Sequence, residues 1–309
     1  MHSTNSFIYT VIERIRGYLD DPDLDAKYSD DFLLRHIVMP SMVNVLSRIN
    51  NSLSNPVVSR LRVSLEADQQ YYQLPPTVGE VWNVCVYDTD AGRITEDFVP
   101  RGYWNPRGPN WSIEANQLSI RPIPQEAKDI DIFYTHTGDL LLHYGTTSTG
   151  FTLDSSETDP QLRVLQLDAS PTIGAIDKRP NAYAGSMLRV LSGNVIEEKV
   201  IESSSSDANS SAIEVTTRTP VEFHDSDTTI TYEIAPVGFQ PLYEAISASG
   251  ALKLASYKKI TGVHFQMIQM QYKDALKTAA DHYANMQMRM PKHLDKDTWD
   301  NSDNSLLNY

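Results

Sequence analysis

Two stretches of the chain alternate apolar and polar residues with a period of two. They span residues 71–88 and 116–137 and place β-branched residues such as Val84 and Ile132 at alternate positions. Successive side chains of a strand point to opposite faces, so this period is typical of a strand with one buried face. Residues 57–70 alternate in the same way and predict a strand that leads into the first stretch.

A helical period precedes these strands. Apolar residues at positions 7–19 fall on one helical face, and Asp20-Asp21-Pro22 predicts the end of that helix. Ser29 is the expected N-cap of a second helix, because acidic residues follow it in the first turn. Pro40 lies inside the second helix and predicts a kink or a break, and Asn50-Asn51-Ser52 predicts its end.

Two further helices are predicted near the end of the chain. The first begins at Pro241, a favoured first-turn residue, and Gly262 is its expected C-cap. The second ends before Pro291 and is roughly 40 Å long at about 1.5 Å per residue. Its apolar residues recur in steps of three and four and predict a seam that packs on other helices, made of Phe265, Ile268, Tyr272, Ala275, Ala279, Tyr283, Met286 and Met290.

The composition changes between residues 150 and 235, where Ser, Thr and Asp surround short β-branched runs. Turn signals separate these runs, which is typical of a small all-β sandwich or barrel. The serine-rich residues 203–211 are expected to form a solvated loop or hairpin tip.

The predicted fold class is α+β. It combines a helical bundle, formed by the N- and C-terminal helices with a small β unit, and an inserted all-β domain that resembles a sandwich or barrel. The expected domains are a discontinuous body at 1–149 and 236–291, the inserted β domain at 150–235, and an extended C-terminal arm at 292–309.

Several large side chains are candidates for contacts with a partner. Trp104 and Trp111 fall in residues 98–116, a Pro- and Gly-rich stretch predicted to be a loop, where they either tuck onto the subunit's own core or anchor a partner. The arm at 292–309 is too polar to order alone, so it is either disordered or folds on a neighbour. The interface candidates are Trp104, Trp111, Tyr272, Tyr283, Met286, Trp299, Leu306, Leu307 and Tyr309.

Composition and charge narrow the possible functions. The 309 residues are 40% hydrophobic, which is enough for one sizeable core and a smaller one. The sequence contains no long apolar run and no secretory pattern at its N-terminus, so neither a membrane span nor a signal peptide is expected. The net charge of −14 disfavours a protein that grips nucleic acid. It suits a channel through which DNA slides, because an acidic wall does not hold phosphates, but solubility alone explains the charge equally well.

Motifs for chemistry are mostly missing. No phosphate-binding loop, metalloprotease motif or nucleophile elbow occurs. Cys85 lies in a strand pattern and is expected to be a small buried side chain rather than a nucleophile. His136 and His143 are near each other in the sequence, but the spacing supplies no third metal ligand. No metal or cofactor is therefore expected, and the methionines of the longest helix are expected to pack at its seam, namely Met267, Met270, Met286, Met288 and Met290.

The order of these parts resembles the head–tail adaptor (connector) proteins of tailed bacteriophages. The resemblance is carried by residues 72–75 and 80–84 (Y-x-L-P followed by E-V-x-x-V), 118–124, 130–134, and by Tyr272, Ala275 and Leu276. Residues 151–235 match nothing in a minimal adaptor and look like the β domain that longer members insert.

The resemblance implies a structural subunit without enzymatic activity. Members of this family form a dodecameric ring beneath the portal, extend the DNA channel and offer a docking surface to the tail. The implied partners are other copies of the chain, the portal protein, and tail or tail-nozzle proteins, while DNA passes through the lumen without sequence-specific binding. The implied location is the virion neck, between capsid and tail, after synthesis in the host cytoplasm.

Two other functions stay open on the sequence alone. One is another neck, tail or baseplate protein whose β domain binds a glycan or a receptor, which solvent-facing Tyr or Trp side chains on residues 151–235 would favour. The other is a hydrolase with a carboxylate pair, whose signature would be a pocket with two close carboxylates of raised pKa.

Overall fold

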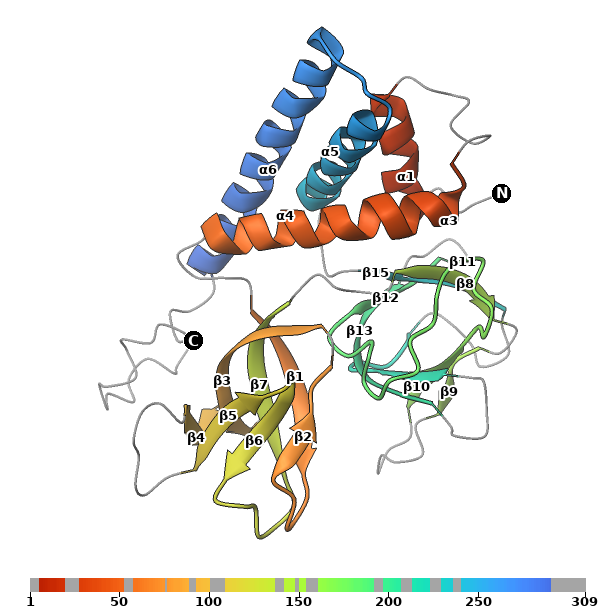
Figure 1. Ribbon diagram of the computed structural model, residues 1–309. Coiled ribbons are helices and arrows are strands. Elements are labelled where there is room, and N and C mark those ends of the chain that lie inside the picture. The colour runs from red at the N-terminus through yellow and green to blue at the C-terminus, as the bar shows by residue number, and fades with distance from the viewer. Residues whose placement is uncertain are drawn as a thin grey trace.

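The computed structural model shows a mixed α+β protein in which helices lie on one side of two large curled sheets (Figure 1). It describes residues 6–19, 28–52, 58–75, 77–88, 93–100, 109–136, 142–147, 150–153, 161–191, 197–206, 213–222, 229–235 and 240–289.

The helices form where the apolar period predicts them. They are α1 (Phe7–Tyr18), α3 (Asp30–Leu33), α4 (Met39–Ser52), α5 (Gln240–Tyr257) and α6 (Val263–Arg289), with a π-helical turn, η1 (Leu34–Val38), between α3 and α4. Ser6 and Ser29 cap α1 and α3, because their Oγ atoms accept the N–H groups of Tyr9 at 3.3 Å and Phe32 at 3.2 Å. The predicted cap at Ser29 is thus confirmed.

The disturbance expected at Pro40 takes the form of the π-helical turn η1. Proline has no N–H and crowds the carbonyl four residues before it, so a regular α-helix cannot pass through it. The chain instead widens just before Pro40, and the N–H of Met39 bonds to the carbonyl of Leu34, five residues back. The helix then continues to Ser52, as predicted.

The prediction that Gly262 ends the first C-terminal helix is wrong. Lys259 takes the left-handed conformation, with φ of 55°, and the N–H of Ile260 bonds to the carbonyl of Ala255 at 3.0 Å. This is a Schellman ending with a lysine in the position that glycine usually fills. Gly262 instead precedes α6, where its carbonyl accepts the N–H of Gln266 at 3.2 Å.

The first sheet contains both of the stretches with period two. Its strands are β1 (Val58–Leu65), β2 (Tyr71–Gln73), β3 (Val78–Asp88), β4 (Arg93–Pro100), β5 (Asn110–Glu114), β6 (Gln117–Arg121) and β7 (Lys128–His136), in the order β1-β7-β3-β4-β5-β6-β2. The loop predicted at residues 98–116 is wrong at its two ends, since β4 and β5 pair there in parallel through Val99 and Asn110.

The second sheet follows and contains most of the predicted β domain. Its strands are β8 (His143–Thr147), β9 (Thr152–Leu153), β10 (Leu162–Leu167), β11 (Ile173–Gly174), β12 (Met187–Val190), β13 (Glu197–Ser206), β14 (Ile213–Thr217) and β15 (Ile230–Ala235), in the order β11-β8-β15-β12-β13-β14-β10-β9. The sheet starts at His143, before the expected boundary at residue 150. Ser203 to Ser206 pair with β14, because backbone pairing does not depend on apolar side chains. The rest of the predicted loop or hairpin tip, residues 207–211, lies outside the described residues.

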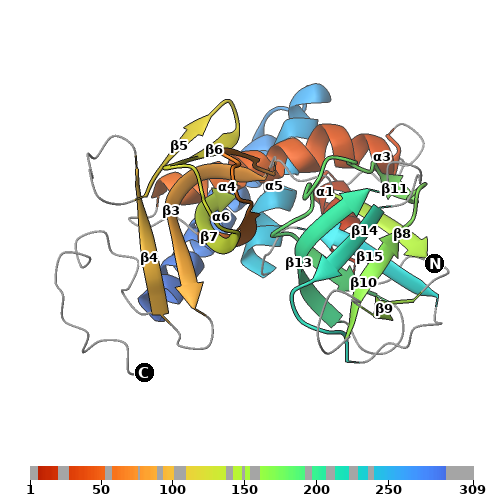
Figure 2. The same cartoon turned by 90° about the horizontal axis from the view of Figure 1, so that it is seen from below.

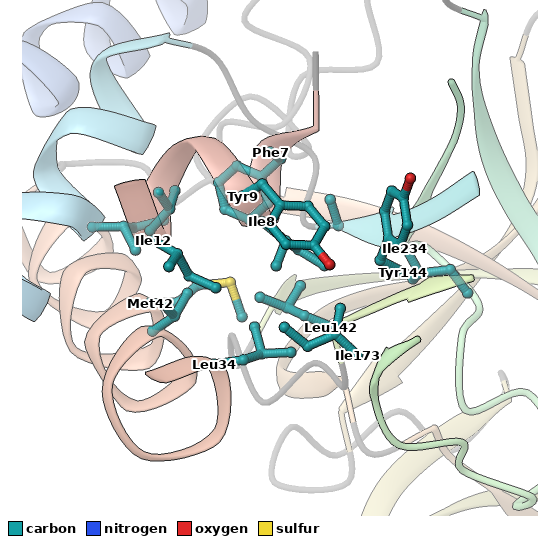
Figure 3. Packing of buried hydrophobic residues seen from close by; sticks show 14 of the residues in the cluster. Phe7, Ile8, Tyr9, Ile12, Leu34, Met42, Leu142, Tyr144, Ile173 and Ile234 are labelled. Atoms are coloured by element: carbon teal, nitrogen blue, oxygen red, sulfur yellow. The ribbon is translucent and has the colours of Figure 1, made fainter. Parts of the chain in front are cut away.

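The hydrophobic cores divide the chain differently from the predicted domains. Helices and second sheet share one core, in which Ile8 and Met42 from the helices meet Leu142 and Ile234 (Figure 3). The first sheet has a core of its own, built around Val84, Ile132 and neighbours. Figure 2, seen from below, shows the two sheets side by side in front of the helices. The helices therefore belong with the second sheet rather than with the first.

A buried carboxylate fixes α1 to the second sheet. Glu233 of β15 is fully buried and accepts the N–H of Phe7 at 2.7 Å and the Ser6 hydroxyl at 2.6 Å. Glu233 also accepts the N–H of Ile8 at 3.3 Å and pairs with the Arg189 guanidinium, which in turn binds Glu198 with an Nε–Oε1 distance of 2.7 Å. A carboxylate at a helix N-terminus also meets the positive end of the helix dipole.

Candidate interaction surface

The longest helix, α6, carries apolar residues on two opposite faces. On one face Ile268, Tyr272, Ala279 and Tyr283 are buried against the rest of the chain. Residues two positions apart on an α-helix point about 200° away from each other. Met270 lies two positions from both Ile268 and Tyr272, so it projects away from the buried face.

The outer face of α6 starts with three exposed apolar residues. Val263, Met267 and Met270 expose 73%, 54% and 62% of their surface, and their spacing of four and three places them on one side of the helix. Tyr257, which is 61% exposed, ends α5 on the other side of the connection to α6. We call Val263, Met267 and Met270 the outer stripe of α6. Isolated exposed apolar residues are ordinary on protein surfaces, but a group at helical spacing marks a candidate contact site.

The outer stripe lies in an uncharged part of an acidic protein. Residues 260–272 contain no Asp, Glu, Lys or Arg, whereas the whole chain has a net charge of −14. Three glutamines lie between the apolar positions, at 266, 269 and 271. Long neutral side chains of this kind can pack or form hydrogen bonds across a contact without bringing charge into it.

The start of α6 is held in place by neighbouring helices. The imidazole Nε2 of His264 lies 2.8 Å from the carbonyl oxygen of Tyr18, at the end of α1. Further along, the guanidinium of Arg48 in α4 lies 5.7 Å from the centre of the Tyr272 ring. The outer stripe is therefore displayed on a supported helix, which limits the conformational entropy lost when a partner binds.

The residues predicted as interface anchors lie in different places in the structure. Trp111 is 8% exposed and packs in the core of the first sheet. Of the two roles expected for it, it therefore has the one in the subunit's own core rather than that of a partner anchor. Tyr272 and Tyr283 are buried against the other helices of the same chain, which gives them a role in the subunit's own core. The other candidates lie outside the described residues or have side chains outside them, namely Trp104, Met286, Trp299, Leu306, Leu307 and Tyr309.

The predicted position of two methionines is wrong. Met267 and Met270 were expected at the seam of α6, yet they project from the opposite face. The sequence carried a usable signal, because Ile268 and Tyr272 fix the direction of the seam and both methionines are out of phase with it. Val263 was not predicted as a contact residue at all.

The groups capable of chemistry are scattered. Among the described residues, no three His, Cys, Asp or Glu side chains are placed to hold a metal ion. Cys85 is buried as predicted, and burial with the nearby Asp131 raises the pKa of its thiol to about 12. Burial also raises the pKa of Asp97, while hydrogen bonds with the Asn83 side chain and the Phe98 backbone act to lower it. His143 is buried without a hydrogen-bond partner among the described residues, and the side chain of His136 lies outside them.

Comparison with known proteins does not identify the chain further. No protein-family model and no curated protein sequence matches it. In the described part of the chain, no helix combines the length and apolar character needed to cross a membrane.

Proposed function

We propose that this chain is a structural subunit of a phage neck, which forms a ring between the portal and the tail and extends the DNA channel. The resemblance of its parts to head–tail adaptors supports the proposal. The structural observation that carries it is the outer stripe of α6, an exposed apolar surface on a helix that already buries its opposite face.

The occupant that we propose for the outer stripe is a neighbouring copy of the same chain. Two copies with a net charge of −14 repel each other wherever acidic surfaces meet. An uncharged segment avoids this repulsion, and burying a methionine side chain stabilises a contact by about 1.5–3 kcal/mol. In a ring, the stripe would meet a different surface of the neighbour, since such contacts are heterologous.

The test is assembly of the full chain with and without a portal ring, followed by negative-stain imaging and mass photometry. Met270→Glu should prevent ring closure, because a buried unpaired carboxylate at a contact typically costs about 2 kcal/mol or more. Its melting temperature should stay at the wild-type value, because Met270 is 62% exposed in the subunit.

Thr278→Glu is the matched control for this experiment. Thr278 is also exposed on α6, lies beyond the uncharged segment, and gives the same change in charge. This variant should assemble like the wild type. Rings formed equally by both variants would remove the outer stripe from the interface. A wild-type chain that makes no ring, even with the portal present, would contradict the proposed function itself.

The two alternative functions find less support. Tyr183 and Tyr232 are the tyrosines of residues 151–235, and both are buried, so they offer no stacking surface for a glycan. A hydrolase of the carboxylate-pair type needs two close acids with raised pKa values. Burial is the main cause of the raised pKa of Asp97, and no second carboxylate contributes to that shift.

A further inference from the structure

The two sheets meet at a small contact that is rich in arginine. A turn before β12 reaches the first sheet, where Ala184 enters the core and its carbonyl accepts the Thr77 hydroxyl at 3.4 Å. Arg218, which follows β14, reaches the same region, and its Nη2 donates to the carbonyl of Arg60 in β1 at 3.1 Å. The contact therefore brings cationic side chains from both sheets together.

One buried carboxylate lies at this contact. Asp131 of β7 has a side chain that is 1% exposed and pairs in register with Arg62 of β1. The Arg62 guanidinium binds both of its oxygens, with Nε–Oδ1 at 3.1 Å and Nη2–Oδ2 at 3.2 Å. Arg60 lies on the same face of β1 but is farther away, with Nη1–Oδ2 at 3.8 Å. The acidic group is thus mainly occupied by Arg62.

Within the described part of the chain, no carboxylate is paired with Arg218 as closely as Asp131 is with Arg62. Its Nε is buried and has no hydrogen-bond partner among the described residues. Burial is the largest influence on its guanidinium and lowers the pKa, and the nearby positive charge of Arg60 lowers it further. Glu202 and Asp131 act in the opposite direction but do not reverse the shift. Burial and a neighbouring cation both disfavour the charged form of Arg218, and a further anion beside it would stabilise that form.

We infer that Arg60 and Arg218 form a binding site for a small tetrahedral oxyanion of the phosphate type at the contact between the two sheets. Guanidinium groups present planar pairs of N–H donors, which match the oxygens of phosphate and sulfate. A bound oxyanion would accept a hydrogen bond from the buried Nε of Arg218 and offset the repulsion between the two cations. Because the arginines come from different sheets, the ion would also hold the sheets together. This site is independent of the proposed neck function.

The experiment is calorimetric titration of the full chain with inorganic phosphate, and with sodium chloride at the same ionic strength. Phosphate should bind saturably and chloride should not, which separates a specific site from general salt effects. Arg218→Gln should weaken phosphate binding at least tenfold. Arg35→Gln, which removes the same charge from an exposed position on the helices, should bind phosphate like the wild type.

Two further variants keep the test decisive if Arg218→Gln does not fold. Arg218→Lys keeps the charge without the planar pair of donors, and Arg60→Gln removes the second cation. Both should bind phosphate more weakly than the wild type while circular dichroism shows a folded chain. Absence of saturable binding, or equal affinity in the wild type and all arginine variants, would overturn the assignment.

Discussion

Glu233→Ala should lower the free energy of unfolding by about 3–5 kcal/mol, because it removes one member of a buried ion pair and leaves a buried charge on Arg189. The same change leaves the Ser6 hydroxyl and the N–H of Phe7, which bond to Glu233 at 2.6 and 2.7 Å, without their acceptor. Urea denaturation at neutral pH, followed by circular dichroism, measures the loss.

Glu198→Ala provides the matched control for this prediction. Glu198 binds the same arginine, but 46% of its side chain is exposed, so its removal should cost about 1 kcal/mol or less. Adding Arg189→Met to Glu233→Ala should recover part of the loss, since the double variant leaves no unpaired buried charge at this position. If both single alanine variants lowered the free energy of unfolding by the same amount, burial of Glu233 would add nothing to its contribution to stability.

The local patterns of the sequence predicted individual elements well. Period-two alternation predicted β1, β3 and β7, since one face of each strand is buried, and Ser29 identified a helix start through its capping chemistry. The strand β5 was missed because Pro, Gly and Trp around residues 98–116 hid a short alternation with Trp111 inward. The end of α5 was missed because Lys259 takes the left-handed position that ends the helix, three residues before Gly262, which also has a positive φ.

The sequence could not show which sheet would share a core with the helices. That arrangement depends on contacts between residues far apart in the chain, such as the edge-on packing of Tyr9 of α1 against Tyr144 of β8 at 5.2 Å. The apolar period of an amphipathic helix predicts which face is buried, but not which sheet or helix that face packs against. The sequence predicted the buried face of α6 correctly. The outer stripe was not predicted, although its position on the opposite face follows from the geometry of the helix.

The second large effect is expected at His143, in the core of the second sheet. Its ring is fully buried and lies edge-on to Tyr183 and Tyr232, with ring centres 5.5 and 5.6 Å apart. The hydroxyl oxygens of these tyrosines accept backbone N–H groups of Asp177 and Asp168. Neither ring nitrogen of His143 has a hydrogen-bond partner among the described residues. Burial lowers the pKa of His143 from its usual value of 6.5 to about 3.

This shift makes the protein sensitive to acid. Below pH 6.5 the unfolded chain binds a proton at His143, while the folded chain stays neutral until the pH approaches 3. His143 therefore does not reduce the free energy of unfolding above pH 6.5. As the pH decreases from 6.5 towards 3, the free energy of unfolding falls. Between pH 7.5 and 4.5 the contribution of this one residue should amount to about 2–3 kcal/mol.

His143→Leu should remove this part of the pH dependence. Carboxylates also titrate in acid, so the quantity to compare is the loss of unfolding free energy from pH 7.5 to 4.5 in the variant and in the wild type. The variant should lose about 2–3 kcal/mol less, even if its stability at neutral pH changes through altered packing. His36→Gln removes an exposed imidazole from the helices and controls for the general loss of a histidine. Parallel stability curves for the wild type and His143→Leu would show that the imidazole is solvated or paired in the folded protein.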